Sequence, residues 1–221
     1  MGSFDRNWEK VHQEREWGKY PAESTIRFVA RNYYSSPKRC KVKILDFGCG
    51  GGATTWYLAA EGFDTYAFDG SITAVEKTRQ LLEAHNVKAA LRTADALDTE
   101  YENETFDAVI DCVCATLNTL GNIKKIYSEI FRILKPKGKL FSTSFTADTT
   151  GYSTGEKLEE NTFRSITEGA IFGHGIVHFT TREEITAMLS EIGFKNIAVD
   201  TLRYTDRGNI ISQPMVTAER D

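Results

Sequence analysis

The sequence contains few of the features that mark membrane, secreted or metal-binding proteins. No run of residues approaches the roughly 20 apolar positions of a membrane span, and the polar start of the chain is unlike a signal peptide. The four cysteines are too few for a disulfide framework in 221 residues, and their spacings are not those of zinc ligands. We therefore expect a cytoplasmic protein with reduced thiols, without a metal site and without a membrane partner.

Basic residues are also too few to indicate a nucleic-acid partner. Lysine and arginine number 27 against 31 aspartates and glutamates, which gives a formal net charge of −4 at pH 7. Proteins that bind nucleic acid usually gather an excess of positive charge on one face. Internal repeats, low-complexity tracts and linkers are lacking as well, so we expect residues 1–221 to form a single domain, as a monomer or a homodimer.

What the sequence does contain is a regular alternation of strand-like and helix-like segments. Short apolar runs that predict buried strands occupy residues 42–47, 64–68, 87–93, 106–112 and 139–145. Segments that predict helices lie between them, at residues 54–61, 72–84 and 123–134. Ser71 is the expected N-cap of the second helix. This alternation is typical of an α/β fold in which helices cover both faces of a mostly parallel, doubly wound sheet.

The two ends of the chain follow different patterns. Residues 1–35 are rich in aromatic and charged side chains and predict helices, the second of which we expect Pro21 to open. Residues 146–178 are polar, rich in threonine and glycine, and without a clear period. Thr181-Arg182-Glu183-Glu184 then fits a capping box at the start of a helix that ends near Gly193.

A final hairpin and one internal turn complete the expected fold. Residues 195–204 and 209–217 flank the turn Thr205-Asp206-Arg207-Gly208, which predicts an antiparallel hairpin. Pro214 lacks a backbone donor, so we expect a bulge or an early end of the last strand there. Lys135-Pro136-Lys137-Gly138 is expected to form a turn ahead of the strand that begins at Lys139.

A glycine-rich loop follows the first predicted strand and opens the next helix. It consists of Asp46-Phe47-Gly48-Cys49-Gly50-Gly51-Gly52-Ala53. A cofactor that lies against the backbone at the carboxyl end of a strand leaves no room for a Cβ atom, which favours glycine. The loop satisfies G-x-G-x-x-A, and Asp69 stands 21 residues after Gly48, where an NAD-binding protein has its acidic residue. The loop alone therefore leaves two cofactors open, NAD and S-adenosylmethionine (SAM).

Charge favours SAM. Asp46 lies two residues before the first glycine, where a carboxylate would repel a pyrophosphate but attract the sulfonium and ammonium groups of SAM. Asp95 ends the third predicted strand and is placed to accept a hydrogen bond from the exocyclic amine of an adenine. The end of the chain is a third feature that favours SAM: the segment Leu134–Leu140 is followed by a strand and a reversed hairpin.

These segments resemble, in order and spacing, the successive motifs of class I SAM-dependent methyltransferases, through ILDFGCGGG, YAFDGS, TADAL, FDAVIDCVCATLN and ILKPKGKLF. The resemblance covers Val42–Phe145 well and the later helix and hairpin in outline. It implies a seven-stranded, mostly parallel sheet with a C-terminal antiparallel hairpin, and SAM as the cofactor, with S-adenosylhomocysteine as the product. It also implies an order of parts: a helical lid over 1–35, a SAM-binding core over 42–145, an insertion over the active site at 146–180, and a C-terminal helix and hairpin at 181–221.

The resemblance further implies a set of cofactor-binding residues. The loop around the methionine moiety and ribose comprises Asp46, Gly48, Gly50 and Gly52, and Asp69 accepts hydrogen bonds from both ribose hydroxyls. Gly70, Ser71, Asp95 and Ala96 lie beside the adenine, while backbone groups of Asp111 and Cys112 meet the methionine end. The sequence departs from the family pattern in its apolar Cys112-Val113-Cys114-Ala115, and we interpret the two cysteines as small core residues on one face of a strand.

Methyl transfer from a sulfonium is an in-line displacement, which needs alignment of the reactants and, for a protonated nucleophile, a general base. Segments expected over the carboxyl ends of the strands supply the candidates for substrate binding, namely Trp17, Tyr20, Asn118, Tyr152 and Arg164. His174 and His178 would point to one side of an extended chain and are the candidate bases. Each of these residues also has a structural interpretation, as a cover for an apolar surface or as a partly buried polar group.

Two motifs of DNA-modifying enzymes with this fold are missing after the fourth predicted strand. The segment has no Asn/Asp-Pro-Pro-Tyr, and Asp111 and Val113, not proline, precede the two cysteines. We therefore expect methylation of an O or N atom of a small metabolite or sugar-like acceptor. The sequence leaves three alternatives open: an NAD-dependent oxidoreductase, a non-catalytic SAM-binding module, and a methyltransferase that acts on a protein side chain.

Overall fold

The computed structural model describes residues 2–16 and 18–221. The helices are α1 (Asn7–Glu14), α2 (Glu23–Tyr33), α3 (Ala53–Ala60), α4 (Ile72–Ala84), α5 (Leu120–Ile133) and α6 (Arg182–Ile192), with a 3-10 turn, η1 (Arg39–Lys41). The strands are β1 (Lys43–Phe47), β2 (Asp64–Asp69), β3 (Ala90–Thr93), β4 (Phe106–Cys112), β5 (Leu134–Thr143), β6 (Glu156–Glu159), β7 (Thr162–Arg164), β8 (Ile176–His178), β9 (Phe194–Asp206) and β10 (Asn209–Arg220). Among the described residues, no helix has both the length and the apolar character to cross a membrane.

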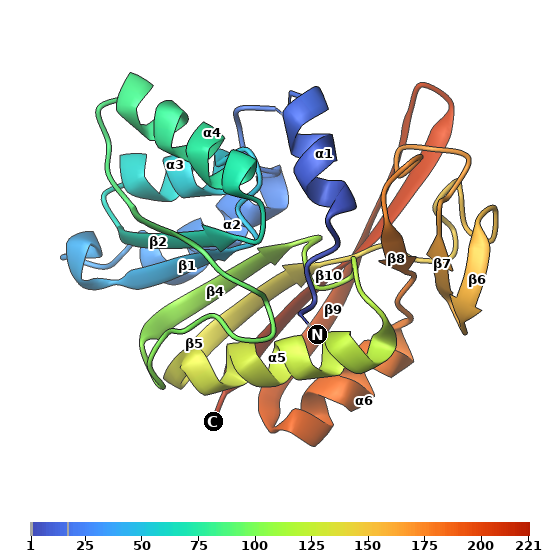
Figure 1. Ribbon diagram of the computed structural model, residues 1–221. Helices are drawn as coiled ribbons and strands as arrows, with labels where there is room; N and C mark the ends of the chain where they lie inside the picture. The colour runs from blue at the N-terminus through green and yellow to red at the C-terminus, as the bar shows by residue number, and fades with distance from the viewer. Residues whose placement is uncertain (1, 17) are drawn as a thin grey trace.

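Seven strands form the central sheet, in the order β3-β2-β1-β4-β5-β10-β9 (Figure 1). β1 pairs in parallel with β2 and β4, and the same direction continues through β3 and β5. β10 runs antiparallel to both of its neighbours, β5 and β9. The predicted doubly wound, mostly parallel sheet with a C-terminal antiparallel hairpin is confirmed. Because the chain winds outward from β1 in one direction and from β4 in the other, the carboxyl ends of these two strands border a crevice of the kind that ligands occupy.

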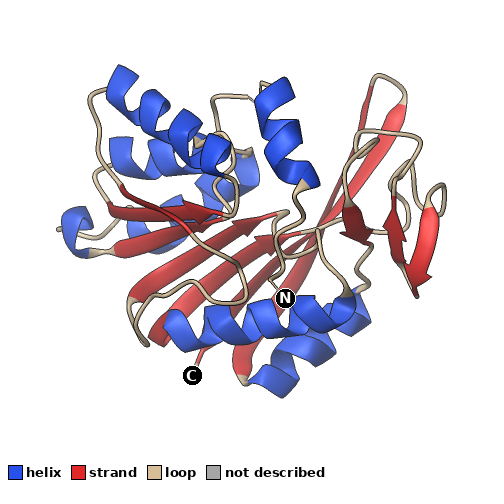
Figure 2. Ribbon diagram, in the orientation of Figure 1, coloured by secondary structure: helices blue, strands red, loops and turns tan. Residues whose placement is uncertain are grey.

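Helices cover the two faces of the sheet, α2, α3 and α4 on one and α5 and α6 on the other (Figure 2). Ile44 of β1 and Ile110 of β4 belong to the apolar core under α2 and α3, together with Phe28 and Leu58. Leu45, the next residue of β1, belongs to the core under α5 and α6. Successive side chains of a strand point to opposite faces, so a strand covered on both faces must be apolar almost throughout. This requirement explains the unbroken apolar runs in the sequence.

Residues 146–180 contain a small antiparallel sheet of β6, β7 and β8, which lies beside the β9–β10 hairpin (Figure 1). Its strands have only three or four residues, too few for a visible period in the sequence. Phe163, Val177 and Phe179 form an apolar cluster with Ile211 of β10. Phe179 also bridges to Phe145, just beyond β5. The insertion is thereby fixed over the carboxyl edge of the central sheet.

The predicted helix signals agree with the structure. Ser71 Oγ accepts a hydrogen bond from the amide of Ala74 at 3.0 Å, as an N-cap does. Thr181 Oγ1 accepts from the amide of Glu184 at 3.1 Å, and Gly193 ends α6 with a φ of 118°. Pro21, in contrast, stands two residues before α2 begins, so it does not occupy the first helical position.

The turn expected at Lys135–Gly138 is wrong. These residues belong to β5, which begins at Leu134 and pairs there with Phe106 before the register shifts along β4. Lys137 has a φ of 64°, and a Cβ on Gly138 would lie 2.7 Å from the carbonyl oxygen of Lys135. The turn-like residues therefore build a bulge within a longer strand and do not separate the strand from the helix.

The expectation at Pro214 is also wrong, since β10 continues unbroken through it to Arg220 and pairs Pro214 with Thr201 of β9. Pairing of β10 with β5 starts only at Met215. Pro214 thus lies where the strand has a neighbour on one side, and a proline is tolerated there because its missing donor has no acceptor to serve. The register shift of β10 lies further along, between Thr217 and Glu219.

Arg220, at the end of β10, binds the carbonyl groups at the end of α5. Its guanidinium donates to the carbonyl oxygens of Phe131 and Arg132 at 3.1 and 3.0 Å, and also to that of Leu134. The carbonyls of Phe131 and Arg132 lie in the last turn of α5 and have no partner within the helix, so a side chain from a distant strand binds them. The last strand and the helix before β5 are thereby joined by hydrogen bonds from one residue.

We predict that Arg220→Ala lowers the free energy of unfolding by about 2 kcal/mol, because it leaves several carbonyl groups without their charged donor. Urea denaturation followed by circular dichroism measures this value. Lys124→Ala is the matched control, since it removes an ion pair from α5 to Glu191 at 2.7 Å in which both side chains are more than half exposed. That variant should change the value by less than about 0.5 kcal/mol. Equal effects of the two substitutions would contradict the role given to Arg220.

Candidate functional site

A cavity of about 470 Å³ lies at the carboxyl ends of β1, β2 and β4. Its size falls within the range of roughly 300–1,000 Å³ that is usual for small-molecule sites. The glycine loop and the ends of the strands form its inner wall. The outer wall comes from segments far apart in the sequence: residues 3–12 and 18–22, the insertion and the β9–β10 hairpin. In Figure 1, α1 and the insertion flank the region where these strands end.

The glycine loop has little room for side chains. Gly48 has a φ of 74°, and a Cβ there would lie 2.4 Å from the Sγ atom of Cys114. Gly50 lines the cavity, and its amide points to Asp69. A Cβ on Gly52 would lie 2.7 Å from Oγ1 of Thr78, on α4. Gly52 is therefore required for the packing of α3 against α4, and it does not line the cavity.

Asp69, the last residue of β2, is held by backbone amides on both carboxylate oxygens. Oδ2 accepts from the amide of Gly50 and Oδ1 from that of Ser71, each at 2.9 Å. Burial raises the pKa of Asp69, and the two amide bonds and the nearby His12 oppose this shift. Each oxygen keeps a lone pair beyond its amide bond, so the carboxylate can accept further hydrogen bonds from a ligand.

Two more acidic groups are buried near the cavity. Asp46 lines it and accepts from Thr55 Oγ1 at 2.6 Å; burial raises its pKa to about 7. Asp111 lies behind the wall, with a bond from Ser142 Oγ at 2.7 Å, and burial raises its pKa to about 6. These shifts mean that a positive charge in the cavity would be stabilised by ionisation of both carboxyl groups.

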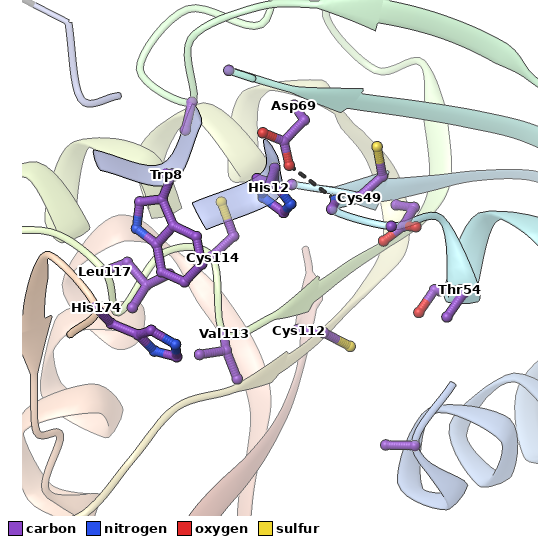
Figure 3. A pocket seen from close by; sticks show the side chains of 18 of the residues that line it. Trp8, His12, Cys49, Thr54, Asp69, Cys112, Val113, Cys114, Leu117 and His174 are labelled. Carbon is purple, nitrogen blue, oxygen red and sulfur yellow. Dashed lines mark hydrogen bonds between the residues drawn. The ribbon is translucent and has the colours of Figure 1, made fainter. Parts of the chain in front are cut away.

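Helix α1 places two aromatic side chains in the outer wall (Figure 3). Trp8 packs against His174 of the insertion, with ring centroids 5.0 Å apart, and against His12, at 5.8 Å. His12 lies across the loop from Asp69, and a Cβ on Gly50 would be 3.5 Å from its Cε1 atom. Burial lowers the pKa of His12, an effect that Asp69 opposes.

His174 lines the cavity, but its surroundings do not suit a general base. Burial lowers its pKa to about 4, and Arg15 contributes to this shift. Arginine can only donate, so the 3.3 Å contact from Arg15 Nη1 makes His174 Nε2 an acceptor. The neutral ring then carries its proton on Nδ1. A base with so low a pKa is weak at neutral pH, and the catalytic role expected of His174 stays a prediction.

His178, the second candidate base, does not line the cavity. It is fully buried in β8, where Nδ1 contacts Thr162 Oγ1 at 2.8 Å and Nε2 contacts Glu184 Oε1 at 2.6 Å. Glu184 is the residue expected to complete the capping box of α6. Its carboxylate binds this histidine, so His178 joins the insertion to α6.

The residues predicted to bind substrate separate into two groups. Tyr20 and Asn118 line the cavity, Tyr20 at 76% exposure and Asn118 buried. Tyr152 and Arg164 do not, because Tyr152 OH donates to Asn161 and Arg164 pairs with Glu156 across β6 and β7. Trp17 lies outside the described residues.

The predicted cofactor residues separate in the same way. Those that line the cavity are Asp46, Gly48, Gly50, Asp69, Gly70, Ala96 and Cys112. Those that do not are Gly52, Ser71, Asp95 and Asp111. Ser71 caps α4, and its hydroxyl also donates to Glu9 of α1 at 2.5 Å. The cofactor role of both groups stays a prediction.

Cys112, the last residue of β4, and Cys114, which follows the strand, do not share one face, contrary to expectation. Val113 between them has a φ of 68°, which turns the backbone out of the strand. Cys112 therefore packs with the core under α2 and α3, and Cys114 with the core under α5 and α6, and both line the cavity. Burial raises the pKa of Cys112 to about 12 and that of Cys114 well above its usual value, so both remain thiols. No group of three or more metal-binding side chains occurs in the part of the chain that the structure describes.

Sequence reasoning missed several residues of the outer wall. Phe4, Trp8 and His12 come from the N-terminal segment, and Tyr204 and Gln213 from the hairpin. Trp8 and His12 are four residues apart, a helical spacing that places them on one face and was available in the sequence. The hairpin residues carried no such signal, because their position depends on how far the two strands extend past β5.

The sequence is similar to those of known methyltransferases. Residues 44–138 match the family described as "Methyltransferase domain". A curated relative, ubiquinone biosynthesis O-methyltransferase of Rickettsia akari, is 25% identical over 151 residues, which are 68% of this chain and 58% of the relative. The chain covers 58%, 47% and 56% of the first three curated relatives that it matches, less than two thirds of their length.

Solved structures resemble nearly the whole chain. A SAM-dependent methyltransferase from Methanosarcina mazei has a TM-score of 0.68 at 23% identity, over 80% of this chain and 92% of that one. Magnesium protoporphyrin IX methyltransferase from Synechocystis PCC 6803, solved with bound SAM, has a TM-score of 0.66 at 14% identity, over 97% and 90%. The chain therefore has the fold of these SAM-dependent methyltransferases, and residues 44–138 match the methyltransferase domain family.

Proposed function

We propose that this protein transfers a methyl group from SAM to a small, uncharged and largely apolar acceptor. One observation carries the proposal: Asp46 and Asp69 face the cavity, and among the described residues that line it there is no lysine or arginine. A dinucleotide would bring a pyrophosphate to the glycine loop, beside two acidic groups and without a cation to balance it. SAM brings a sulfonium and an ammonium group, which these carboxylates stabilise.

The residues present fit SAM. Gly48, Gly50 and Gly51, which have no side chains, let a ligand approach the ends of β1 and β2. Asp69 is fixed by the amides of Gly50 and Ser71 and keeps lone pairs for two ribose hydroxyls. Ala94, Ala96 and the edge of Gly70 form an apolar end suited to a flat, uncharged base. The related structure with bound SAM supports the same assignment.

When bound, SAM supplies a methyl group on a positively charged sulfur that leaves as a neutral thioether. The chain has to exclude water and hold the nucleophilic atom of the acceptor in line. Trp8, Leu117, Phe145, Ile171 and Ile211 provide an apolar wall for this purpose. Apolar surface desolvates the reacting atoms and gives a sugar few hydrogen-bond partners, so we narrow the acceptor from the sugar-like class to apolar molecules.

Hydrogen-bonding groups in this wall are few. The neutral His174 donates, and the buried Asn118 both donates and accepts. A hydroxyl, carbonyl or amine on the acceptor can be oriented by these two side chains. His174 accepts from Arg15 and has no role as a base in this proposal. The curated relative named as an O-methyltransferase of ubiquinone biosynthesis supports an acceptor of this general type.

The first test is parallel calorimetric titration of the protein with SAM, S-adenosylhomocysteine and NAD. We predict micromolar binding of the first two and none of NAD. Binding of NAD alone would replace the proposal with an oxidoreductase. If SAM binds, a screen of quinols, phenols and amines with radioactive methyl-SAM identifies the acceptor class. Labelling of added protein in place of these compounds, or of nothing, would favour a protein acceptor or a non-catalytic SAM-binding module.

We predict that Asp69→Ala weakens SAM binding by roughly 10- to 150-fold, the usual effect of losing hydrogen bonds to a charged group. Calorimetry at pH 7.5 measures the dissociation constant, and circular dichroism confirms that the variant is folded. Asp148→Ala removes an exposed acid outside the cavity and serves as the control. An unchanged affinity in a folded Asp69→Ala protein would contradict the assignment of the ribose site.

We also predict that SAM affinity rises with pH between 5.5 and 7.5. Burial raises the pKa of Asp46 to about 7, so this carboxyl is largely neutral at the lower pH and ionised at the higher one. A cationic ligand prefers the ionised form, and each unit by which it lowers the pKa is worth about tenfold in affinity. Titration at pH 6.5 in buffers of different ionisation enthalpy should show proton release on binding. Asp46→Asn should reduce both effects, whereas Asp148→Asn should leave them unchanged.

A further inference from the structure

The N-terminal segment occupies Asp95, the residue predicted to accept a hydrogen bond from adenine. Its carboxylate accepts from the amide and the hydroxyl of Ser3 at 2.7 and 2.8 Å, and from the amide of Phe4 at 3.1 Å. The amide of Leu97, in the same turn as Asp95, donates at 2.9 Å. Burial by itself would raise the pKa of Asp95, but these bonds lower it below its usual value. Asp95 is thus an ionised anchor for the start of the chain, and it does not line the cavity.

The same contact brings an aromatic ring to the end of β2. A Cβ on Gly70 would lie 2.2 Å from Cδ2 of Phe4, so the ring occupies the space of the side chain that Gly70 lacks. Phe4 and Gly70 both line the cavity, together with Ala94 and Ala96. The apolar end of the cavity therefore has an aromatic surface that comes from the N-terminal segment.

The segment is held at several other points. Glu9 of α1 accepts from Ser71 Oγ and Thr73 Oγ1, each at 2.5 Å, which fixes α1 to the start of α4. Asp5 lies against the insertion, where a Cβ on Gly175 would be 2.0 Å from its Oδ2 atom. Residues 3–9 thus form a strap that is tied to Asp95 at one end and to α4 at the other. Between these ties it passes over Asp69 and Gly70.

We propose that the strap is a permanent wall of the cofactor site, in which Phe4 stacks on the adenine and Asp95 holds the strap in place of binding the adenine amine. The proposal rests on SAM as the cofactor. It assigns a binding role to Phe4 and changes the role of Asp95 from direct contact to positioning. We favour this role over one in which Phe4 blocks the site, because the cavity of about 470 Å³ is present with Phe4 in its lining.

The first experiment compares Phe4→Ala, Phe4→Trp and wild type in calorimetric titrations with S-adenosylhomocysteine, SAM and adenosine. Loss of an aromatic stacking surface weakens base binding by about tenfold or more, so Phe4→Ala should bind all three ligands more weakly. Phe4→Trp should restore most of the affinity. Phe172→Ala is the matched control, because that ring is 55% exposed and lies outside the cavity lining.

The second experiment tests whether Asp95 acts through the strap. Asp95→Asn loses charged acceptors for Ser3 and Phe4 and should weaken binding of S-adenosylhomocysteine by several-fold. In the Phe4→Ala background the same substitution should add less than about twofold, because residues that act through one contact are not additive. Additive losses would mean that Asp95 contacts the adenine itself and would overturn its positioning role.

The outcomes separate this inference from the proposed function. If wild type binds neither SAM nor S-adenosylhomocysteine, the proposed function fails. If wild type binds both and Phe4→Ala binds them equally well, the stacking role fails while the function stands. Tighter binding by Phe4→Ala would show that the ring blocks the site. Thermal unfolding without ligand shows which variants are folded, and Phe4→Leu, which keeps an apolar side chain without the aromatic face, replaces Phe4→Ala if the latter does not fold.

Discussion

The carboxylate of Asp69 is the interaction on which the arrangement of the site depends. It joins the glycine loop, through Gly50, to the start of α4, through Ser71, and it is close enough to His12 to affect that ring electrostatically. One acidic group therefore fixes the glycine loop relative to the start of α4. A glycine loop without this acceptor would leave buried amides unpaired, which costs free energy comparable to a lost hydrogen bond.

The electrostatics of the site oppose its own stability. Asp46, Asp69 and Asp111 are buried close together, and burial raises the pKa of each. Ionised carboxylates in such a place repel one another and lose hydration. Hydrogen bonds from Thr55, Ser142 and backbone amides offset part of this cost. A cationic ligand would offset more of it. The buried carboxyl groups therefore lower the stability of the free protein and raise its affinity for such a ligand.

The alternation of strands and helices could be predicted from sequence, because it depends on local signals, and the resemblance to class I methyltransferases implied the mostly parallel sheet with its C-terminal hairpin. The apolar runs, the glycine loop and the cap at Ser71 each act within a few residues. Three of the predicted site residues bind other groups of the protein. Asp95 binds Ser3, and His178 binds Glu184 in the first turn of α6. Arg164 pairs with Glu156 within a small sheet whose strands are too short to show a period in the sequence. A titratable residue in a loop does not reveal which of these partners it will meet.

The outer wall of the cavity was the least predictable part, since Tyr204 and Gln213 reach it only through the length of the hairpin. The position of β10 between β5 and β9 also has a consequence for synthesis. A nascent chain that has reached the β9–β10 turn presents β5 as an open, apolar edge, to which another chain could pair. The sheet and the outer wall of the cavity are complete only after β10 has left the ribosome and inserted between β5 and β9.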